Sequence, residues 1–232
     1  MAEQAFVGDP GERPARWLRG VALVLAAAVV GLLAFTMRTA ARDASEARRL
    51  VDVLVVQPGQ AVADVGAGSG QFTVALAEAV GRAGRVYATE IDRGRLDDIR
   101  RAVERAGLAN VTLIEATARD SGLPEACCDA ILLRRVYHHF THARDTNATL
   151  YRALRPGGLL AVVDFGPGRN GHAPGGVPAD RGGHGMPREL LIEELAASGF
   201  HVERDEPDWS GRDYLVLFRK PAEHPEPEDP GS

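Results

Sequence analysis

Residues 21–37 (VALVLAAAVVGLLAFTM) contain no charged side chain and are apolar on every side. A spanning helix needs about 20 apolar residues, and Trp17 stands where an interfacial aromatic anchor is common. The segment therefore predicts a single-pass membrane helix, with a cleaved signal segment as the alternative because arginines precede the apolar run. A buried helix of a soluble domain is disfavoured, because the run has no polar face. Arginines flank both sides, so the orientation stays open, and we expect the bacterial inner membrane.

Beyond this segment, short apolar stretches alternate with stretches of helical periodicity. The strand-like stretches are residues 61–65, 85–90, 111–115, 129–135 and 159–165, and the helical ones are residues 44–56, 71–80, 93–106, 146–154 and 188–198. This alternation predicts an α/β fold of the Rossmann-like, doubly wound type with a mostly parallel sheet. Two further strand-like stretches, 200–206 and 213–220, follow without a helix between them. They predict an antiparallel hairpin, so that the sheet has an antiparallel C-terminal edge strand.

The chain divides into one domain with short appendages. We expect a disordered tail over 1–20, the membrane or signal segment over 21–37, the folded domain over 38–220, and a disordered acidic tail over 221–232. Hydrophobic residues make up 45% and charged residues 25%, as in ordinary globular proteins. The net charge of -5 argues against a nucleic-acid partner, which usually requires a basic face.

The two cysteines, Cys127 and Cys128, are adjacent. Neighbouring cysteines rarely bond to each other because the geometry is unfavourable, so we expect two small buried residues at the start of a strand. No cysteine or histidine spacing predicts a metal site.

Asp64 opens the motif D-x-G-x-G-x-G at the end of the first strand. Glycines there allow a tight turn and close approach of the backbone to a ligand, and the following helix presents its free amides. Glu90 ends the second strand, where an acid accepts hydrogen bonds from ribose hydroxyls. The spacing does not fit the dinucleotide fingerprint G-x-G-x-x-G, which disfavours a nicotinamide-dependent reductase.

The glycine motif resembles the first motif of the class I S-adenosyl-methionine-dependent methyltransferases. The resemblance continues through VYATEID (86–92) and YRALRPGGLLAVVDF (151–165), and covers roughly residues 50–220. It implies S-adenosyl-methionine as cofactor. The implied cofactor-binding residues are Asp64, Gly66, Ala67, Gly68 and Gly70 along the loop, Glu90 at the ribose, Ile91, Ala116 and Thr117 at the adenine, and Arg134 at the methionine carboxylate.

Asp120 is an alternative to Ala116 and Thr117 as the residue that meets the adenine amine. Arg134 has two alternatives: it pairs with an acidic substrate, or it is a structural charge.

Three histidines are candidates for catalysis. His138 and His139 follow the fourth strand, and His184 ends a glycine-rich loop that starts at Gly166. An imidazole near the transferred methyl group can act as a general base at neutral pH, although a structural role for one or more of them is open.

The expected function is methyl transfer to an unidentified small-molecule or lipid-like acceptor by direct in-line displacement. The alternative is a non-catalytic, membrane-tethered nucleoside-binding module that keeps the methyltransferase fold.

Overall fold

The computed structural model describes residues 13–168, 175–178 and 184–222. The chain divides into two units, Met1–Ser45 and Glu46–Ser232. In the first unit, helix α1 (Arg13–Val53) begins inside the segment expected to be a disordered tail, and residues 1–12 lie outside the described residues. Arg13 and Pro14 suit the first turn of a helix. Proline has no backbone N–H to donate, but the first turn does not use that donor within the helix. From Val21 onward, α1 is long and apolar enough to cross a membrane, a test that a signal sequence also passes.

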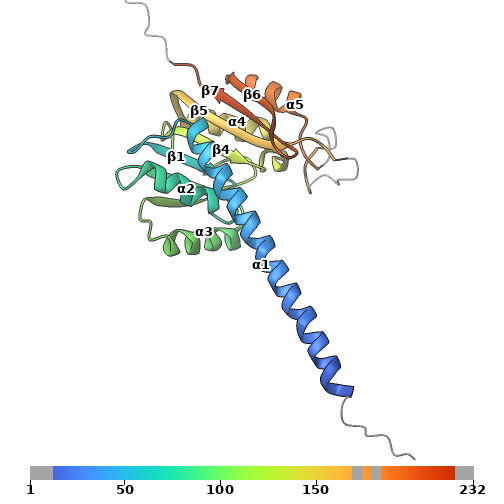
Figure 1. Cartoon of the computed structure of the whole chain (residues 1–232). Coiled ribbons are helices and arrows are strands. Elements are labelled where there is room, and N and C mark those ends of the chain that lie inside the picture. Colours follow the sequence, from blue (N-terminus) through green and yellow to red (C-terminus); the bar gives the residue numbers. More distant parts are fainter. Residues whose placement is uncertain (1–12, 169–174, 179–183, 223–232) are drawn as a thin grey trace, which may run out of the picture. The chain divides into compact units, whose positions relative to one another are not determined.

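The second unit contains a seven-stranded sheet in the order β3-β2-β1-β4-β5-β7-β6 (Figure 1). Its strands are β1 (Ala61–Val65), β2 (Arg85–Glu90), β3 (Val111–Glu115), β4 (Cys128–Arg134), β5 (Leu154–Phe165), β6 (His201–Ser210) and β7 (Asp213–Arg219). Its remaining helices are α2 (Gln71–Val80), α3 (Arg93–Arg105), the 3-10 turn η1 (Tyr137–His139), α4 (Ala143–Ala153) and α5 (Arg188–Ala196). Strands β1 to β5 are parallel, and β7 pairs antiparallel with β5 and β6. The mostly parallel, doubly wound α/β fold is thus confirmed.

One detail of the hairpin differs from the sequence prediction: the C-terminal strand β7 is not the edge strand. It lies between β5 and β6, and β6 forms the edge. Six of the seven residues of β7 are buried, so both of its faces require cover. Strand β6 carries exposed charged side chains, which suit an edge because they discourage pairing with another chain.

Successive residues of the central strands point to opposite faces, as a pleated strand requires. In β1, Val62 packs into a core with α2 and the last turns of α1, whereas Ala63 packs into a core with α4 and α5. Helices therefore cover both faces of the sheet, which leaves its carboxyl end as the open edge for ligands.

The structure joins Cys127 and Cys128 by a disulfide, so the expectation that they do not bond is wrong. Their burial at the start of β4 is as expected, with exposed fractions of 8% and 0%. In the acidic tail, residues 223–232 lie outside the described residues.

Candidate active site

A glycine loop connects β1 to α2 at the carboxyl end of the sheet. Gly66, Gly68 and Gly70 have φ angles of 69°, 58° and 79°, a region that other residues rarely adopt. A Cβ atom on Gly66 would lie 2.3 Å from Cγ2 of Val136, so the space there is also closed to a side chain. The backbone amides of Gly66 and Ala67 both donate to the carbonyl of Thr89, which fastens the loop to the end of β2.

Asp64 lies beneath this loop and is buried, with 2% of its surface exposed. Its Oδ2 accepts a hydrogen bond of 2.6 Å from the hydroxyl of Thr73 in α2. Burial raises the pKa of the Asp64 carboxyl to about 6, and the charge of Glu90 adds to this, while the Thr73 bond and the charge of Arg134 oppose it. Asp64 therefore ties the end of β1 to the first turn of α2 as a buried carboxyl group.

Glu90 ends β2 directly opposite the loop. Its Oε2 accepts a 3.0 Å hydrogen bond from the amide of Gly68, and its Oε1 accepts one of 2.9 Å from the amide of Ile91. The next residue, Asp92, caps α3 by accepting from the amides of Gly94 and Arg95. The acid predicted to hold a ribose thus holds the glycine loop itself in this structure.

A small cavity of about 40 Å³ lies beside Glu90. It brings together five of the residues implied by the resemblance: Gly66, Glu90, Ile91, Ala116 and Thr117. Small-molecule sites usually measure about 300–1,000 Å³, so this cavity is smaller than an adenosyl group requires.

Two neighbouring side chains offer contacts that an adenosyl ligand can use. The buried hydroxyl of Thr89 has no hydrogen-bond partner among the described residues, although it lines this cavity. Ile91 exposes 58% of its surface, an apolar face open to a flat ring.

Five of the predicted residues lie outside the lining of this cavity. Ala67, Gly68 and Gly70 continue the loop, and Asp64 precedes it at the end of β1. Arg134 is engaged elsewhere: its Nη2 donates to Glu46 at 2.8 Å, and its guanidinium lies 4.8 Å from the centre of the Phe72 ring. The role of Arg134 at the methionine carboxylate stays a prediction.

The three candidate histidines lie together at the ends of β4 and β5. The ring centre of His138 lies 4.1 Å from that of His139 and 5.3 Å from that of His184. A residue missed in the sequence completes the group: Asp164, which is fully buried and lies 2.8 Å from Nδ1 of His138. Its signal in the sequence was one acid inside the apolar run LLAVVDF.

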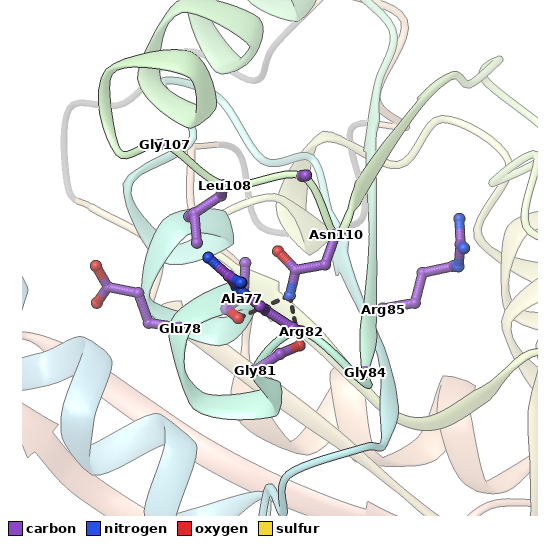
Figure 2. A pocket seen from close by; sticks show the side chains of 10 residues that line it. Ala77, Glu78, Gly81, Arg82, Gly84, Arg85, Gly107, Leu108 and Asn110 are labelled. Atoms are coloured by element: carbon purple, nitrogen blue, oxygen red, sulfur yellow. Dashed lines mark hydrogen bonds between the residues drawn. The ribbon is translucent and has the colours of Figure 1, made fainter.

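A cavity of about 450 Å³ lies at the opposite end of the strands, between the end of α2 and the turn before β3 (Figure 2). Asn110 lines this cavity, and its amide side chain is already engaged: Nδ2 donates to the carbonyls of Ala77 and Gly81 (Figure 2). Arg85, which also lines this cavity, donates to the hydroxyl of Thr112 at 3.1 Å. None of the predicted site residues lines this larger cavity. Among the described residues, no three His, Cys, Asp or Glu side chains are placed to hold a metal ion.

Residues 63–162 match the family model described as a methyltransferase domain. This part of the chain is a class I S-adenosyl-methionine-dependent methyltransferase domain. The ubiquinone/menaquinone biosynthesis C-methyltransferase UbiE of Vibrio vulnificus is 29% identical over 119 residues, which are 51% of this chain and 46% of that protein. The demethylmenaquinone methyltransferase of Geobacillus sp. is 33% identical over 113 residues, 47% of each protein. The chain thus spans about half the length of the curated relatives it matches.

The fold of the methyltransferase domain recurs in solved structures. A SAM-dependent methyltransferase from Aquifex aeolicus superposes with a TM-score of 0.62 at 21% identity, over 75% of this chain and 89% of that chain. The cofactor of the domain is S-adenosyl-methionine. The glycine cradle, the orphan Thr89 hydroxyl and the exposed Ile91 are features of this chain that fit it.

Proposed function

We propose that this protein transfers the methyl group of S-adenosyl-methionine to a small, lipid-like acceptor by direct in-line displacement. The observation that carries this proposal is the glycine loop folded onto Glu90 above a cavity lined by five of the residues implied for the cofactor. The bound cofactor supplies an electrophilic methyl group. The protein then has to align the acceptor and exclude water, and needs no covalent nucleophile of its own.

The proposed binding roles follow the positions of the side chains. When the loop opens, the freed oxygens of Glu90 accept hydrogen bonds from ribose hydroxyls, and Gly68 turns its amide toward the ligand. Ile91 packs against the adenine, with Ala116 and Thr117 at its edge. Asp64 keeps the β1 end of the loop in place, and Arg134, once released from Glu46, pairs with the methionine carboxylate.

The acceptor class rests on the curated relatives and on α1. The relatives are named for methylation in ubiquinone and menaquinone biosynthesis, so an acceptor of comparable, membrane-soluble chemistry suits this chain. We place the protein at a membrane through α1 as a single-pass anchor. The side of the membrane is left open, because arginines flank both ends of the apolar run.

The non-catalytic alternative is not favoured. A protein that keeps the fold but has lost its activity does not need an intact glycine loop, an acid at the ribose position and an unpartnered hydroxyl around one cavity. The methyltransferase and the non-catalytic module differ in one measurable way: the module binds the nucleoside but transfers no methyl group.

Calorimetry on the full chain in detergent tests cofactor choice. We expect heat from S-adenosyl-methionine and S-adenosyl-homocysteine, and none from NAD. Transfer of a labelled methyl group from S-adenosyl-methionine to a membrane lipid extract then tests turnover. Binding of NAD without either sulfur nucleoside overturns the proposal, and binding without any labelled product supports the non-catalytic module.

A further inference from the structure

The two edge strands of the sheet differ in how they are protected against pairing with another chain. Strand β6 carries four consecutive charged residues over 203–206, followed by Pro207, and register shifts interrupt its pairing with β7 twice. Such features keep an edge strand from adding a neighbour. Strand β3 has no proline, pairs with β2 residue by residue, and is uncharged from Val111 to Ile114. The β3 edge is therefore open to a further strand.

The backbone of β3 presents its outward-pointing groups at alternate residues. In a parallel ladder, the N–H and C=O of one residue point to the same neighbouring strand, and those of the next residue point the other way. The carbonyl of Asn110 and the amide of Ala116, one residue before and one residue after β3, both bond to β2. By alternation, the even-numbered residues within β3 also bond to β2. The N–H and C=O groups that point outward belong to three residues: Val111, Leu113 and Glu115.

A hollow of about 350 Å³ lies between α3 and this edge. Its apolar lining is Val103 of α3 with Val111 and Leu113 of β3, and its charged lining is Arg100 and Glu104. The apolar side chains of β3 are only partly buried within one chain. A strand added at the edge covers them.

A row of alternating charges follows the side of α3 that faces the edge. We name it the charge stripe: Arg93, Asp97, Arg100 and Glu104. Nε of Arg93 donates to Glu115 of β3 at 2.8 Å, and Arg100 pairs with Asp97. Because the spacings are four, three and four residues, these side chains share one side of the helix. Their charges run plus, minus, plus, minus along it.

We propose that a second copy of this chain binds the β3 edge, in an antiparallel pairing whose twofold axis passes through Leu113. Leu113 is an outward-pointing residue, so the two copies exchange both of its backbone hydrogen bonds across the axis. Val111 of each copy then lies opposite Glu115 of the other, and the same patch is used on both sides, as twofold symmetry requires. The inference concerns assembly and does not depend on the reaction.

The charge stripe selects a second copy as the partner because the stripe is complementary to itself. Helix α3 contacts both β2 and β3, so it lies over the space between them. Strands lie about 4.8 Å apart, which places the two copies of α3 about 10 Å apart, where helices pack. The two helices run antiparallel, so the order of charges meets its reverse. Arg93 then faces Glu104 of the second copy. Asp97 faces Arg100 of the second copy.

The strand and the helix give the same position for the axis. Glu115 at one end of β3 accepts from Arg93, and Val111 at the other end lines the hollow together with Val103. The middle of β3 therefore lies beside position 98 of α3, which is also close to the centre of the charge stripe. One axis thus pairs the outward backbone groups, the two hollows and the charges at the same time.

The test measures the oligomeric state of the full chain in detergent, by native mass spectrometry and by sedimentation over a range of concentrations. We expect a dimer. Arg100→Glu replaces attraction to Asp97 of the second copy by repulsion at two symmetric places, and should weaken the dimer by at least about tenfold. Asp97→Arg added to this variant exchanges the two charges and should restore the dimer. The matched control is Arg101→Glu, which breaks the exposed pair with Asp98 outside the charge stripe and should leave the dimer unchanged.

The position of the axis has a test of its own. In Leu113→Cys, the two thiols stand on directly opposite residues whose Cα atoms are about 5.5 Å apart, a distance that suits a disulfide. Copper phenanthroline in air, which takes up the two electrons, should therefore give a covalent dimer. The control Glu115→Cys separates its two thiols by about 13 Å along the strands and should give none.

Thermal midpoints are measured on every variant, so that a variant that fails to fold is recognised. If Arg100→Glu does not fold, the cross-link through position 113 decides. A wild-type chain that stays monomeric overturns the inference, and so does a dimer that is unaffected by a folded Arg100→Glu variant. A covalent dimer from Glu115→Cys and none from Leu113→Cys also overturns it, because the strands would then pair in another register.

Discussion

Glu46 and Arg134 form a partly buried ion pair in which Nη2 of Arg134 donates to Oε2 of Glu46 at 2.8 Å. The other oxygen of Glu46 accepts a 3.2 Å bond from the indole nitrogen of Trp209, and Arg49 lies over the Trp209 ring at 3.7 Å. These contacts join the last turns of α1 to the end of β4 and to β6. They also explain how the charge of Arg134 is tolerated at 20% exposure of its side chain: Glu46 balances it from within the domain.

The first prediction follows from this pair. Glu46→Ala leaves the partly buried guanidinium of Arg134 without its carboxylate, and loss of a hydrogen bond between charged groups costs about 1.5–3 kcal/mol. We expect a clear fall in the thermal midpoint of the full chain in detergent. The matched control is Asp97→Ala, which breaks the exposed pair with Arg100 and costs less than about 1 kcal/mol. Equal effects of the two variants would show that the Glu46 pair contributes no more than a surface pair.

The second prediction concerns Gly66. Gly66→Ala places a Cβ atom against Val136, and overpacking of this kind costs about 1–3 kcal/mol. Gly59→Ala is the control, since Gly59 also has a positive φ but nothing within 4 Å of the added atom. Denaturant unfolding should show a larger loss for Gly66→Ala, and Val136→Ala should recover part of it in the double variant. A loss no larger than that of Gly59→Ala would mean that Val136 moves aside.

The order and type of the elements were predictable because each carries its own pattern. Residues 61–65, 71–80, 85–90 and 111–115 match β1, α2, β2 and β3 as the structure bounds them. The place of β7 was not predictable in this way. Periodicity tells which face of a strand is buried, but the choice of neighbours depends on which strands need cover on both faces, and β7 needs it more than β6.

The contacts of the candidate site also differ in how far the sequence predicts them. The glycine loop and Glu90 follow each other in a single βαβ unit, so local spacing predicts their meeting. The pairs Glu46–Arg134 and His138–Asp164 join residues 88 and 26 positions apart, and no local pattern links them. His138 was a candidate by type alone, and its partner emerged only when β4 and β5 were seen side by side.

The third prediction concerns the ribose acid. A hydrogen bond to a charged acceptor contributes about 1.5–3 kcal/mol, so Glu90→Ala should weaken binding of S-adenosyl-homocysteine by about tenfold to a hundredfold. Because Glu90 also holds the amides of Gly68 and Ile91, some loss of thermal stability should accompany it. Glu115→Ala is the control: this acid ends the neighbouring strand and pairs with Arg93 at the surface. Unchanged affinity in Glu90→Ala would remove the ribose role.

The fourth prediction concerns α1. The full chain should stay in the membrane fraction after carbonate washing, and deletion of residues 1–43 should release a folded domain. Val29→Arg places a charge near the centre of the apolar run, at a cost of about 2.5–3.5 kcal/mol for insertion, and should raise the soluble fraction. The control Thr39→Arg lies beyond that run and should not. A mature N-terminus near Arg42 would identify a cleaved signal in place of an anchor.

The last prediction concerns pH and Asp64. Burial raises the pKa of its carboxyl from 3.8 to about 6, so the folded chain binds this proton more tightly than the unfolded chain. The group therefore stabilises the fold fully below about pH 4, and that contribution is lost as the pH rises through about 6. Asp64→Asn is a neutral isostere whose oxygen can still accept from Thr73. The free energy of unfolding of this variant should match that of the wild type in acid and exceed it at neutral pH, by up to about 3 kcal/mol for a shift of about two units.

Denaturant midpoints measured across this pH range test the prediction, with Asp92→Asn at the exposed cap of α3 as a control. If Asp64→Asn is the less stable protein at neutral pH, the carboxylate must be stabilised in its charged form by the helix start and Arg134 more than burial opposes it.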